Sequence, residues 1–135
     1  MLTSSPSLGK PNPHSERVVA IVTLNDPSAL REVAREAREA ALRGATVRVF
    51  FRDLSIPAIC RPAVAERLGL TGDPGLSGML ERLVRAGDVR LYACSSSLYL
   101  WGVTSGDLLP SIQGARGLIA FLVEDLSGAT RVLSR

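Results

Sequence analysis

Cys94 is the residue of this sequence whose type and position best suit covalent chemistry. It ends an apolar run and is followed by Ser95, Ser96 and Ser97, so it lies where a strand is expected to pass into a helix. The dipole and unpaired N–H groups of a helix start favour a thiolate, and such positions lower a cysteine pKa from about 8.5 to between roughly 3.5 and 7.5. The three serines leave space around the sulfur and can donate hydrogen bonds. The pattern predicts a reactive thiolate at Cys94, with the serines as substrate-binding groups.

The chemistry open to this thiolate is narrowed by its neighbours in the sequence. No histidine or acid stands near Cys94 to form the triad of a thiol protease. Sulfur transfer, redox exchange and reaction with peroxide need no such proton-shuttling partner, and these are the reactions that the pattern favours. A free cysteine is also a common small core residue, so a purely structural Cys94 remains the alternative.

The second cysteine, Cys60, follows the short stretch Pro-Ala-Ile in an expected loop. We predict that it is structural, and the alternative is a second thiol that reaches Cys94 to resolve an oxidised or persulfidated state. The composition predicts a cytoplasmic protein, where thiols stay reduced, and a permanent disulfide between the two cysteines is therefore not expected.

The sequence gives little support for a zinc, nucleotide or flavin site. Two cysteines cannot make a structural zinc site alone. Neither G-x-G-x-x-G nor a Walker A pattern occurs, and the loop "TLNDPS" after the first expected strand contains Asp26, which would repel the phosphate of FMN. We predict no metal and no cofactor.

Alternating strands and helices are expected to position these residues. Apolar runs predict strands at residues 18–23, 46–51 and 88–93, and helical periodicity predicts helices at 27–43, 62–68 and 74–86. Asp26 and Asp73 each precede a proline, which is typical of a capped helix start. Such alternation is typical of a parallel sheet covered on both faces, with reactive groups beyond the carboxyl ends of the strands. Cys94 falls at that edge.

The length and composition predict one domain. The chain has 135 residues, of which 46% are hydrophobic and 21% charged. Residues 1–16 are rich in Ser, Pro, Gly and Asn and are predicted to be a disordered leader, so the only histidine, His14, is poorly placed for catalysis. Residues 17–135 are predicted to form a single α/β domain.

Charge and hydropathy exclude several partners. The net charge is only +3, arginines alternate with glutamates, and aromatic residues make up 4% of the chain. This pattern argues against nucleic-acid binding, which favours clustered cations and stacking rings. No stretch is long enough to span a membrane, and the first residues lack the apolar core of a secretory signal.

The second half of the chain, "VRLYACSSSLYLWGVTSGDLLPSIQGARGLIAFLVEDLSGATRVLS", resembles DsrE/DsrF-like proteins. The stretch "AREAALRGATVRVFF" of the first half is similar to a helix, a closing glycine and the second strand of that family. The resemblance covers about Arg17 to Ser134 and is closest to the DsrE-like subgroup labelled peroxiredoxin-family. It implies a flavodoxin-like three-layer α/β/α fold with a five-stranded parallel sheet and no flavin.

The same resemblance implies a function. DsrE/DsrF-like proteins relay sulfur inside cells as a cysteine persulfide that passes between donor and acceptor proteins, and the family's sulfur-accepting cysteine matches Cys94. They assemble as homo-oligomers, often trimers or hexamers. The alternative is a non-catalytic oligomeric scaffold or small-ligand-binding subunit with an inert Cys94, so the sequence does not decide whether the protein is an enzyme.

The remaining expectations concern the segment after Cys94. Thr104 is predicted to cap a helical turn that ends before Pro110, and Pro110 to start another. Tyr99 and Trp101 are predicted to pack in the core or at a subunit interface. Asp107 and Asp125 are predicted to be capping or surface acids.

Overall fold

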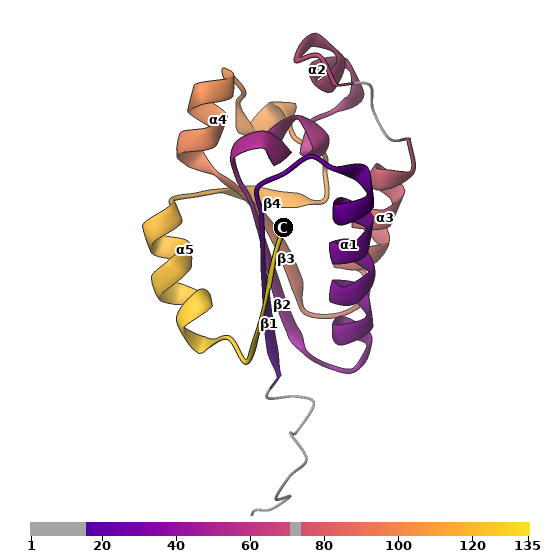
Figure 1. Cartoon of the computed structure of the whole chain (residues 1–135), viewed down its shortest axis with the longest axis vertical. Helices are drawn as coiled ribbons and strands as arrows, with labels where there is room; N and C mark the ends of the chain where they lie inside the picture. The colour runs from indigo at the N-terminus through magenta and orange to yellow at the C-terminus, as the bar shows by residue number, and fades with distance from the viewer. Residues whose placement is uncertain (1–15, 71–73) are drawn as a thin grey trace, which may run out of the picture.

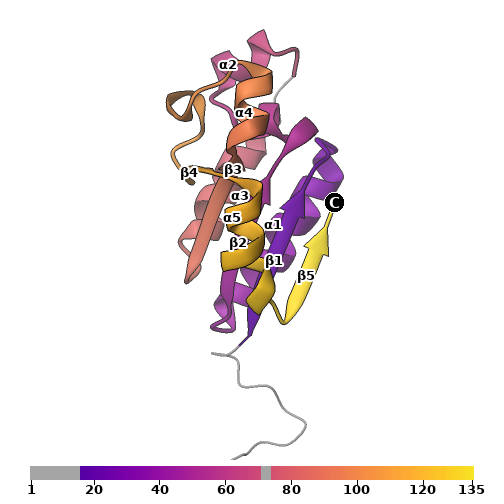
Figure 2. The ribbon, with the colours of Figure 1, turned by 90° about the vertical axis from the view of Figure 1, so that its left-hand side faces the viewer.

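The chain builds one parallel sheet from five strands. A computed structural model describes residues 16–70 and 74–135. The strands lie in the order β4-β3-β2-β1-β5, and all neighbouring pairs are parallel (Figures 1 and 2). Their bounds are β1 (Arg17–Val22), β2 (Thr46–Phe51), β3 (Val89–Cys94), β4 (Ile112–Arg116) and β5 (Arg131–Ser134).

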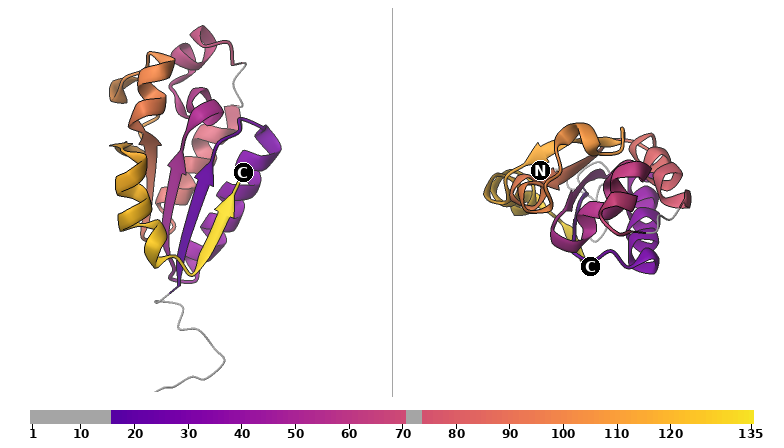
Figure 3. Two further views of the ribbon diagram at one scale, coloured as in Figure 1. Left: turned by 60° about the vertical axis from the view of Figure 1, so that its left-hand side comes forward. Right: turned by 90° about the horizontal axis from the view of Figure 1, so that it is seen from above.

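Helices cover both faces of the sheet. Helices α1 (Pro27–Leu42) and α3 (Pro74–Val84) lie on one face and α5 (Leu118–Glu124) on the other, while α2 (Pro62–Arg67) and α4 (Ser95–Trp101) stand beyond the carboxyl ends of the strands (Figures 1 and 3). The described residues also form the short 3₁₀ helices η2 (Asp53–Ile59), η3 (Ser105–Asp107) and η4 (Leu126–Gly128). The predicted three-layer α/β/α architecture with five parallel strands is confirmed.

The strand order explains why α5 lies alone on its face. The chain adds β2, β3 and β4 in one direction from β1, then returns across the sheet to place β5 on the other side of β1. Because crossovers between parallel strands are right-handed, reversing direction puts the connecting helix on the opposite face. In flavodoxin β1 lies between β2 and β3, whereas here it lies between β2 and β5.

Local signals place the first helix as expected. The Asp26 carboxylate accepts a hydrogen bond from the Ser28 N–H at 3.3 Å, and Pro27 occupies the first turn. Gly44 follows the helix with φ of 94°, a left-handed conformation that suits glycine. Asp26 is thus used as a helix cap. Asp73, the cap predicted for α3, lies outside the described residues.

Alternation along the strands divides the core into two parts. The larger part packs between the sheet and helices α1 and α3, and it contains Val47, Val49 and Phe51 of β2. The smaller part lies under α5, where Phe50 and Phe121 stack with ring centroids 4.5 Å apart. Its buried members are Val19, Phe50, Tyr92, Cys94 and Phe121. The side chain of Cys94 therefore belongs to the α5 side of the sheet.

The segment around Pro110 differs from the prediction. Thr104 and Asp107 form the expected capping box around η3, but Pro110 starts no helix, and β4 begins two residues later. The Leu109 N–H donates to the Ile59 carbonyl at 2.9 Å, so this segment pairs with the loop that carries Cys60. Pairing with another part of the chain replaces the second helical turn.

The predicted leader, residues 1–16, lies outside the described residues except for Glu16, whose carboxylate pairs with Arg43 at 3.3 Å. His14 also lies outside them. None of the helices in the described ranges is long and apolar enough to cross a membrane.

Candidate functional site

Cys94 stands at the junction of β3 and α4. It is the last residue of the strand and the N-cap of the helix, with extended backbone angles of φ −67° and ψ 121°. The residue is buried, with 2% of its surface exposed. The chain therefore places the thiol at the carboxyl edge of the sheet, as the sequence predicts.

Hydrogen bonds set the electrostatics of this thiol. The Sγ atom of Cys94 lies 3.2 Å from the hydroxyl oxygen of Ser96. Burial raises the pKa of the Cys94 thiol, but hydrogen bonds from the side chains and backbone of Ser96 and Ser97 lower it, and the net pKa is below the ordinary value. Hydrogen bonds to the charged form stabilise a thiolate without any general base.

The three predicted serines have different surroundings. Ser96 is exposed and contacts the sulfur, whereas Ser97 is buried and its hydroxyl accepts a hydrogen bond from the Asp53 N–H at 3.0 Å. Ser95 is exposed, and it is not among the residues that shift the pKa of Cys94. The structure brings Ser96 and Ser97 to the thiol and leaves Ser95 at the surface.

The backbone of Asp53 joins the end of β2 to α4. Asp53 has a positive φ of 52°, which is unusual for a residue other than glycine. Its N–H donates to Ser97, and its carbonyl accepts a hydrogen bond from the indole Nε1–H of Trp101 at 2.8 Å. These two bonds hold the first and last turns of α4 against the β2 loop. They thereby fix the position of α4, whose first turn contains Ser96 and Ser97.

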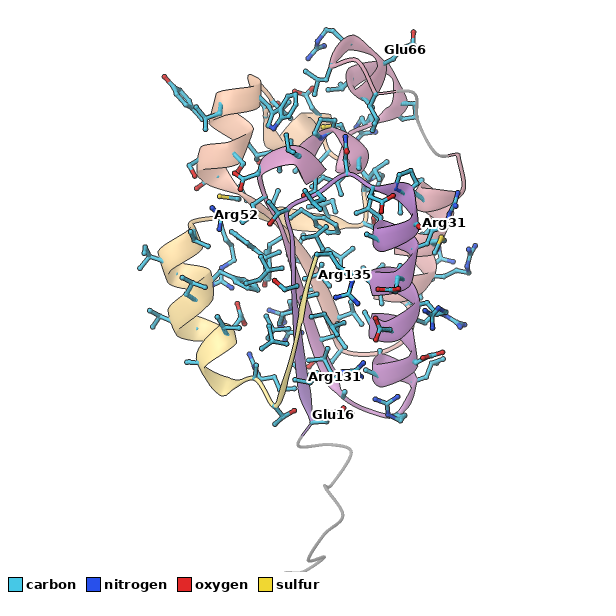
Figure 4. The ribbon with its side chains drawn as sticks, viewed as in Figure 1. Glu16, Arg31, Arg52, Glu66, Arg131 and Arg135 are labelled. Carbon is cyan, nitrogen blue, oxygen red and sulfur yellow. The ribbon has the colours of Figure 1, made fainter. Side chains whose placement is uncertain are left out.

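Two arginines flank Cys94 along the sheet. Arg116 of β4 is the register partner of Cys94, after a bulge in the β3–β4 ladder. On the other side of β3, Phe51 of β2 pairs with Ala93. The residues that follow them, Arg52 and Cys94, are therefore neighbours across the sheet. Figure 4 shows Arg52 near the start of α4, on the side of the sheet that α5 covers. Cations near a thiol favour the thiolate form.

Sequence reasoning missed both arginines. The signal for Arg52 was available, because it follows directly after a predicted strand at the same sheet edge as Cys94. Its Nε atom is buried and has no hydrogen-bond partner among the described residues, although the Asp53 carboxylate lies 3.3 Å away as an ion pair. Arg116 could not be found in the same way, since the strand that carries it was not predicted.

Asp125 is buried, which corrects its predicted role as a capping or surface acid. Only 5% of its surface is exposed. Its carboxylate pairs with Arg116, with Arg17 at 3.1 Å and with Arg48 at 3.9 Å. The Arg116 guanidinium also lies 4.9 Å above the centre of the Tyr92 ring. A carboxylate below α5 can be buried because cations surround it. Asp125 therefore orients Arg116 beside the strand that ends in Cys94.

Cys60 occupies a different environment from Cys94. It is 4% exposed in the core on the α1 side, and its thiol donates to the Ile56 carbonyl at 3.3 Å. Burial, followed by the Asp107 charge, raises the pKa of the Cys60 thiol to about 11. Both cysteines are free, and they belong to different hydrophobic clusters. In this arrangement Cys60 is a neutral core thiol.

The aromatic residues of α4 also have separate environments. Trp101 is half-buried and hydrogen-bonded to Asp53, whereas Tyr99 is 85% exposed and is not part of the core. Tyr99 and Leu100 stand at the surface of α4, and Ile119 and Val123 stand at the surface of α5. The site is thus bordered by exposed apolar side chains.

The arrangement supports nucleophilic chemistry at sulfur. A thiol with a lowered pKa and hydroxyl groups at its helix start can hold a negative charge on sulfur, and neither Arg52 nor Arg116 is among the groups that shift this pKa. Among the described residues, the pKa of the thiol is raised by burial and lowered by the hydrogen bonds of Ser96 and Ser97, and no charged group contributes to its shift. No group of three or more His, Cys, Asp or Glu side chains in those ranges could hold a metal ion.

Comparison with known proteins gives a structural relative. No protein-family model matches the sequence, and no curated protein matches it. The solved structure of MTH1491, a protein of unknown function from Methanobacterium thermoautotrophicum, superimposes with a TM-score of 0.69 at 21% sequence identity. The match covers 89% of this chain and 99% of that one. The likeness shows that the two chains share a fold.

Proposed function

We propose that the protein is an intracellular sulfur carrier that holds sulfane sulfur as a persulfide on Cys94. The Cys94 thiolate attacks the outer sulfur of a donor persulfide. The S–S bond of the donor breaks, and the donor leaves as a thiolate, while Cys94 becomes the persulfide Cys94–S–SH. An acceptor thiolate then takes the outer sulfur by the same exchange, which regenerates Cys94. Sulfur changes carrier in each step, so no separate oxidant or reductant is required.

The observation that carries the proposal is the lowered pKa of Cys94 despite its burial. The thiolate is the nucleophile in thiol chemistry. Burial in an apolar cluster would by itself leave a neutral, inert thiol, and the hydrogen bonds of Ser96 and Ser97 outweigh that effect. A residue that served only as a core hydrophobe would gain nothing from such bonds.

Arg52 and Arg116 support the same proposal. Arg116 is the register partner of Cys94 on β4, and Arg52 follows the last residue of β2, which pairs with Ala93. The buried Nε–H of Arg52 makes no hydrogen bond among the described residues, although the Asp53 carboxylate lies 3.3 Å away as an ion pair. Because a buried donor is costly to leave unpaired, an anionic persulfide sulfur is a fitting acceptor. Arg52 would then stabilise the loaded state more than the empty one.

The burial of Cys94 favours the second candidate function. A donor protein can reach the sulfur only if α4 shifts or opens, because the residue is 2% exposed. A scaffold or small-ligand-binding subunit with an inert thiol would show the same burial without any opening. The two candidates therefore differ in whether Cys94 reacts in the folded protein.

Self-association accompanies either candidate. The exposed side chains of Tyr99, Leu100, Ile119 and Val123 lie on α4 and α5, the helices around Cys94. Exposed apolar groups of this kind gain stability when another chain covers them. We infer that a trimer or hexamer forms through this face, and that donor and acceptor proteins dock at its edge.

The experiment is intact mass after incubation with a low-molecular-weight persulfide donor, with wild type beside Cys94→Ala and Cys60→Ala. The carrier proposal expects one added sulfur in wild type and in Cys60→Ala, its removal by a reductant, and its absence in Cys94→Ala. Arg52→Gln should load less completely at equal donor, while remaining folded. Native mass on the same samples gives the oligomeric state.

Other outcomes have definite meanings. A mass gain that requires both cysteines would replace the carrier by a two-thiol redox cycle. No gain in any variant, together with a native mass showing an intact oligomer, would support the scaffold.

A further inference from the structure

A groove lined by arginines lies between α1 and α3, on the opposite side of the sheet from Cys94. It has a volume of about 600 Å³. Three of its arginines follow each other along α1 at Arg31, Arg35 and Arg38, and Arg82 faces them from α3. Among the described residues, the lining consists of Ser28, Arg31, Glu32, Ala34, Arg35, Arg38, Met79 and Arg82.

Two of the three carboxylates of α1, those of Glu32 and Glu36, are neutralised on the other flank of that helix, whereas no ion pair involves Glu39 within residues 16–70 and 74–135. Glu32 pairs with Arg135, and Glu36 pairs with Arg131 and Arg135. Figure 4 shows Arg131 and Arg135 on the β5 side of α1 and Arg31 on the side toward α3. Glu32, the one glutamate among the described lining residues, is therefore already paired with a cation outside the groove.

Three arginines of the groove, Arg35, Arg38 and Arg82, keep their positive charge available. Within residues 16–70 and 74–135, no ion pair involves Arg35, Arg38 or Arg82. On α3 the neighbouring acid, Glu81, pairs with Arg85 at 3.7 Å instead of Arg82. Guanidiniums bind carboxylates through two parallel hydrogen bonds and hold them better than a point charge would. The groove is thus built for several negative charges.

The arrangement of the charges selects the form of the ligand. Arg31, Arg35 and Arg38 are spaced by four and three residues, so they follow one stripe of α1 that is about 10 Å long. A single phosphate group would need the guanidiniums to converge on one point. Met79 provides partly exposed apolar surface between the charged rows, whereas Ala34 is buried, and methionine adapts to varied apolar partners. None of the described lining residues is aromatic and able to stack on bases.

We propose that this groove binds an acidic amphipathic helix of a partner protein. The apolar face of that helix packs on Met79, and its glutamates or aspartates pair with Arg35, Arg38 and Arg82. This is the helix-in-groove mode of recognition, with anchors at intervals of three and four residues. The inference is independent of sulfur chemistry at Cys94, because the groove lies on the other face of the sheet.

The test uses a fluorescent synthetic peptide with leucines on one helical face and glutamates beside them. Binding to the full chain is measured by anisotropy, beside a peptide of the same composition in scrambled order. Arg35→Glu and Arg82→Glu should each weaken binding about tenfold, because charge reversal replaces an attraction by a repulsion. Arg90→Glu is the matched control, since Arg90 is exposed on β3, outside the groove, and changes the net charge equally. Circular dichroism confirms that each variant is folded, and Arg35→Gln provides a milder change.

The controls separate the other occupants. Equal binding of the scrambled peptide would overturn helix recognition, because charge alone would then suffice. Tighter binding of a single-stranded RNA oligonucleotide, with the same dependence on Arg35, would replace the protein partner by nucleic acid. Displacement of the peptide by millimolar orthophosphate at constant ionic strength would indicate a phosphate site. No binding of the ordered peptide, or equal loss in Arg90→Glu, would contradict the proposal.

Discussion

The Sγ atom of Cys94 lies 3.2 Å from the hydroxyl oxygen of Ser96, two residues further along the chain. This contact follows from local geometry, because Cys94 is the N-cap of α4 and Ser96 is in its first turn. The pKa of the Cys94 thiol thus depends on a side chain that the helix start itself provides. A change at Ser96 should alter the reactivity of the thiol without disturbing the rest of the fold.

Ser96→Ala should slow alkylation of Cys94. Loss of the hydroxyl raises the pKa of the thiol and lowers the fraction of thiolate at neutral pH, and a hydrogen bond to a charged group is strong enough to slow the reaction about tenfold. The measurement is the pH dependence of the iodoacetamide reaction rate, in a Cys60→Ala background. Ser95→Ala is the matched control and should leave the profile unchanged. A profile for Ser96→Ala that superimposes on the parent would show that the contact does not stabilise the thiolate.

The core of the fold was accessible from the sequence because its signals are local. Asp26-Pro27 and Gly44 bound the first helix, and the apolar run at residues 46–51 marks a strand with both faces buried. The position of Cys94 at the sheet edge followed from the same alternation. These elements need only their own residues and general rules of chain direction to be located.

The missed features depend on contacts between distant segments. Strand β4 contains Gln113 and Gly114, lacks a continuous apolar run and is recognisable only beside β3. Without β4, neither Arg116 nor its ion pair with Asp125 could be anticipated. The hydrogen bonds of the Asp53 backbone could not be anticipated either, because those to Ser97 and Trp101 span more than 40 residues of sequence.

Trp101→Phe should lower the free energy of unfolding by about 1 kcal/mol. The change keeps an aromatic ring but removes the Nε1–H donor, which leaves the Asp53 carbonyl without its 2.8 Å bond. Urea denaturation followed by circular dichroism measures the effect, since the variant loses the only tryptophan. Tyr99→Ala serves for comparison, because Tyr99 is 85% exposed and should cost the monomer little. Equal losses in the two variants would contradict a specific role for the indole.

The stability of the protein should decrease as the pH rises from 9.0 to about 11, the ordinary and folded-state pKa values of Cys60. Folding favours the neutral Cys60 thiol, so its contribution is complete below the lower value and is lost as pH passes the higher one, by up to about 3 kcal/mol. Cys94 has the opposite sign, because its pKa is lowered and its contribution is lost as pH falls.

Urea titrations across this pH range test the Cys60 effect. Cys60→Ala should be less stable at neutral pH, because it leaves a small cavity, but it should lack the alkaline decrease. Cys94→Ala should retain that decrease. If all three proteins lose stability in parallel between these pH values, other groups are responsible and the Cys60 thiol is not held neutral by the fold.

Asp125→Asn should destabilise the protein by about 3 kcal/mol or more, because removing one member of a buried ion pair leaves uncompensated charge. Arg116 and Arg48 would then remain near an amide that cannot neutralise them. Glu124→Gln is the matched control: Glu124 also pairs with Arg116, but its side chain is 64% exposed and its loss should cost at most about 1 kcal/mol. Adding Arg116→Met to Asp125→Asn should restore part of the loss, since it removes one of the unpaired cations. A double variant no more stable than Asp125→Asn would show that Asp125 acts through packing under α5 and not through its charge.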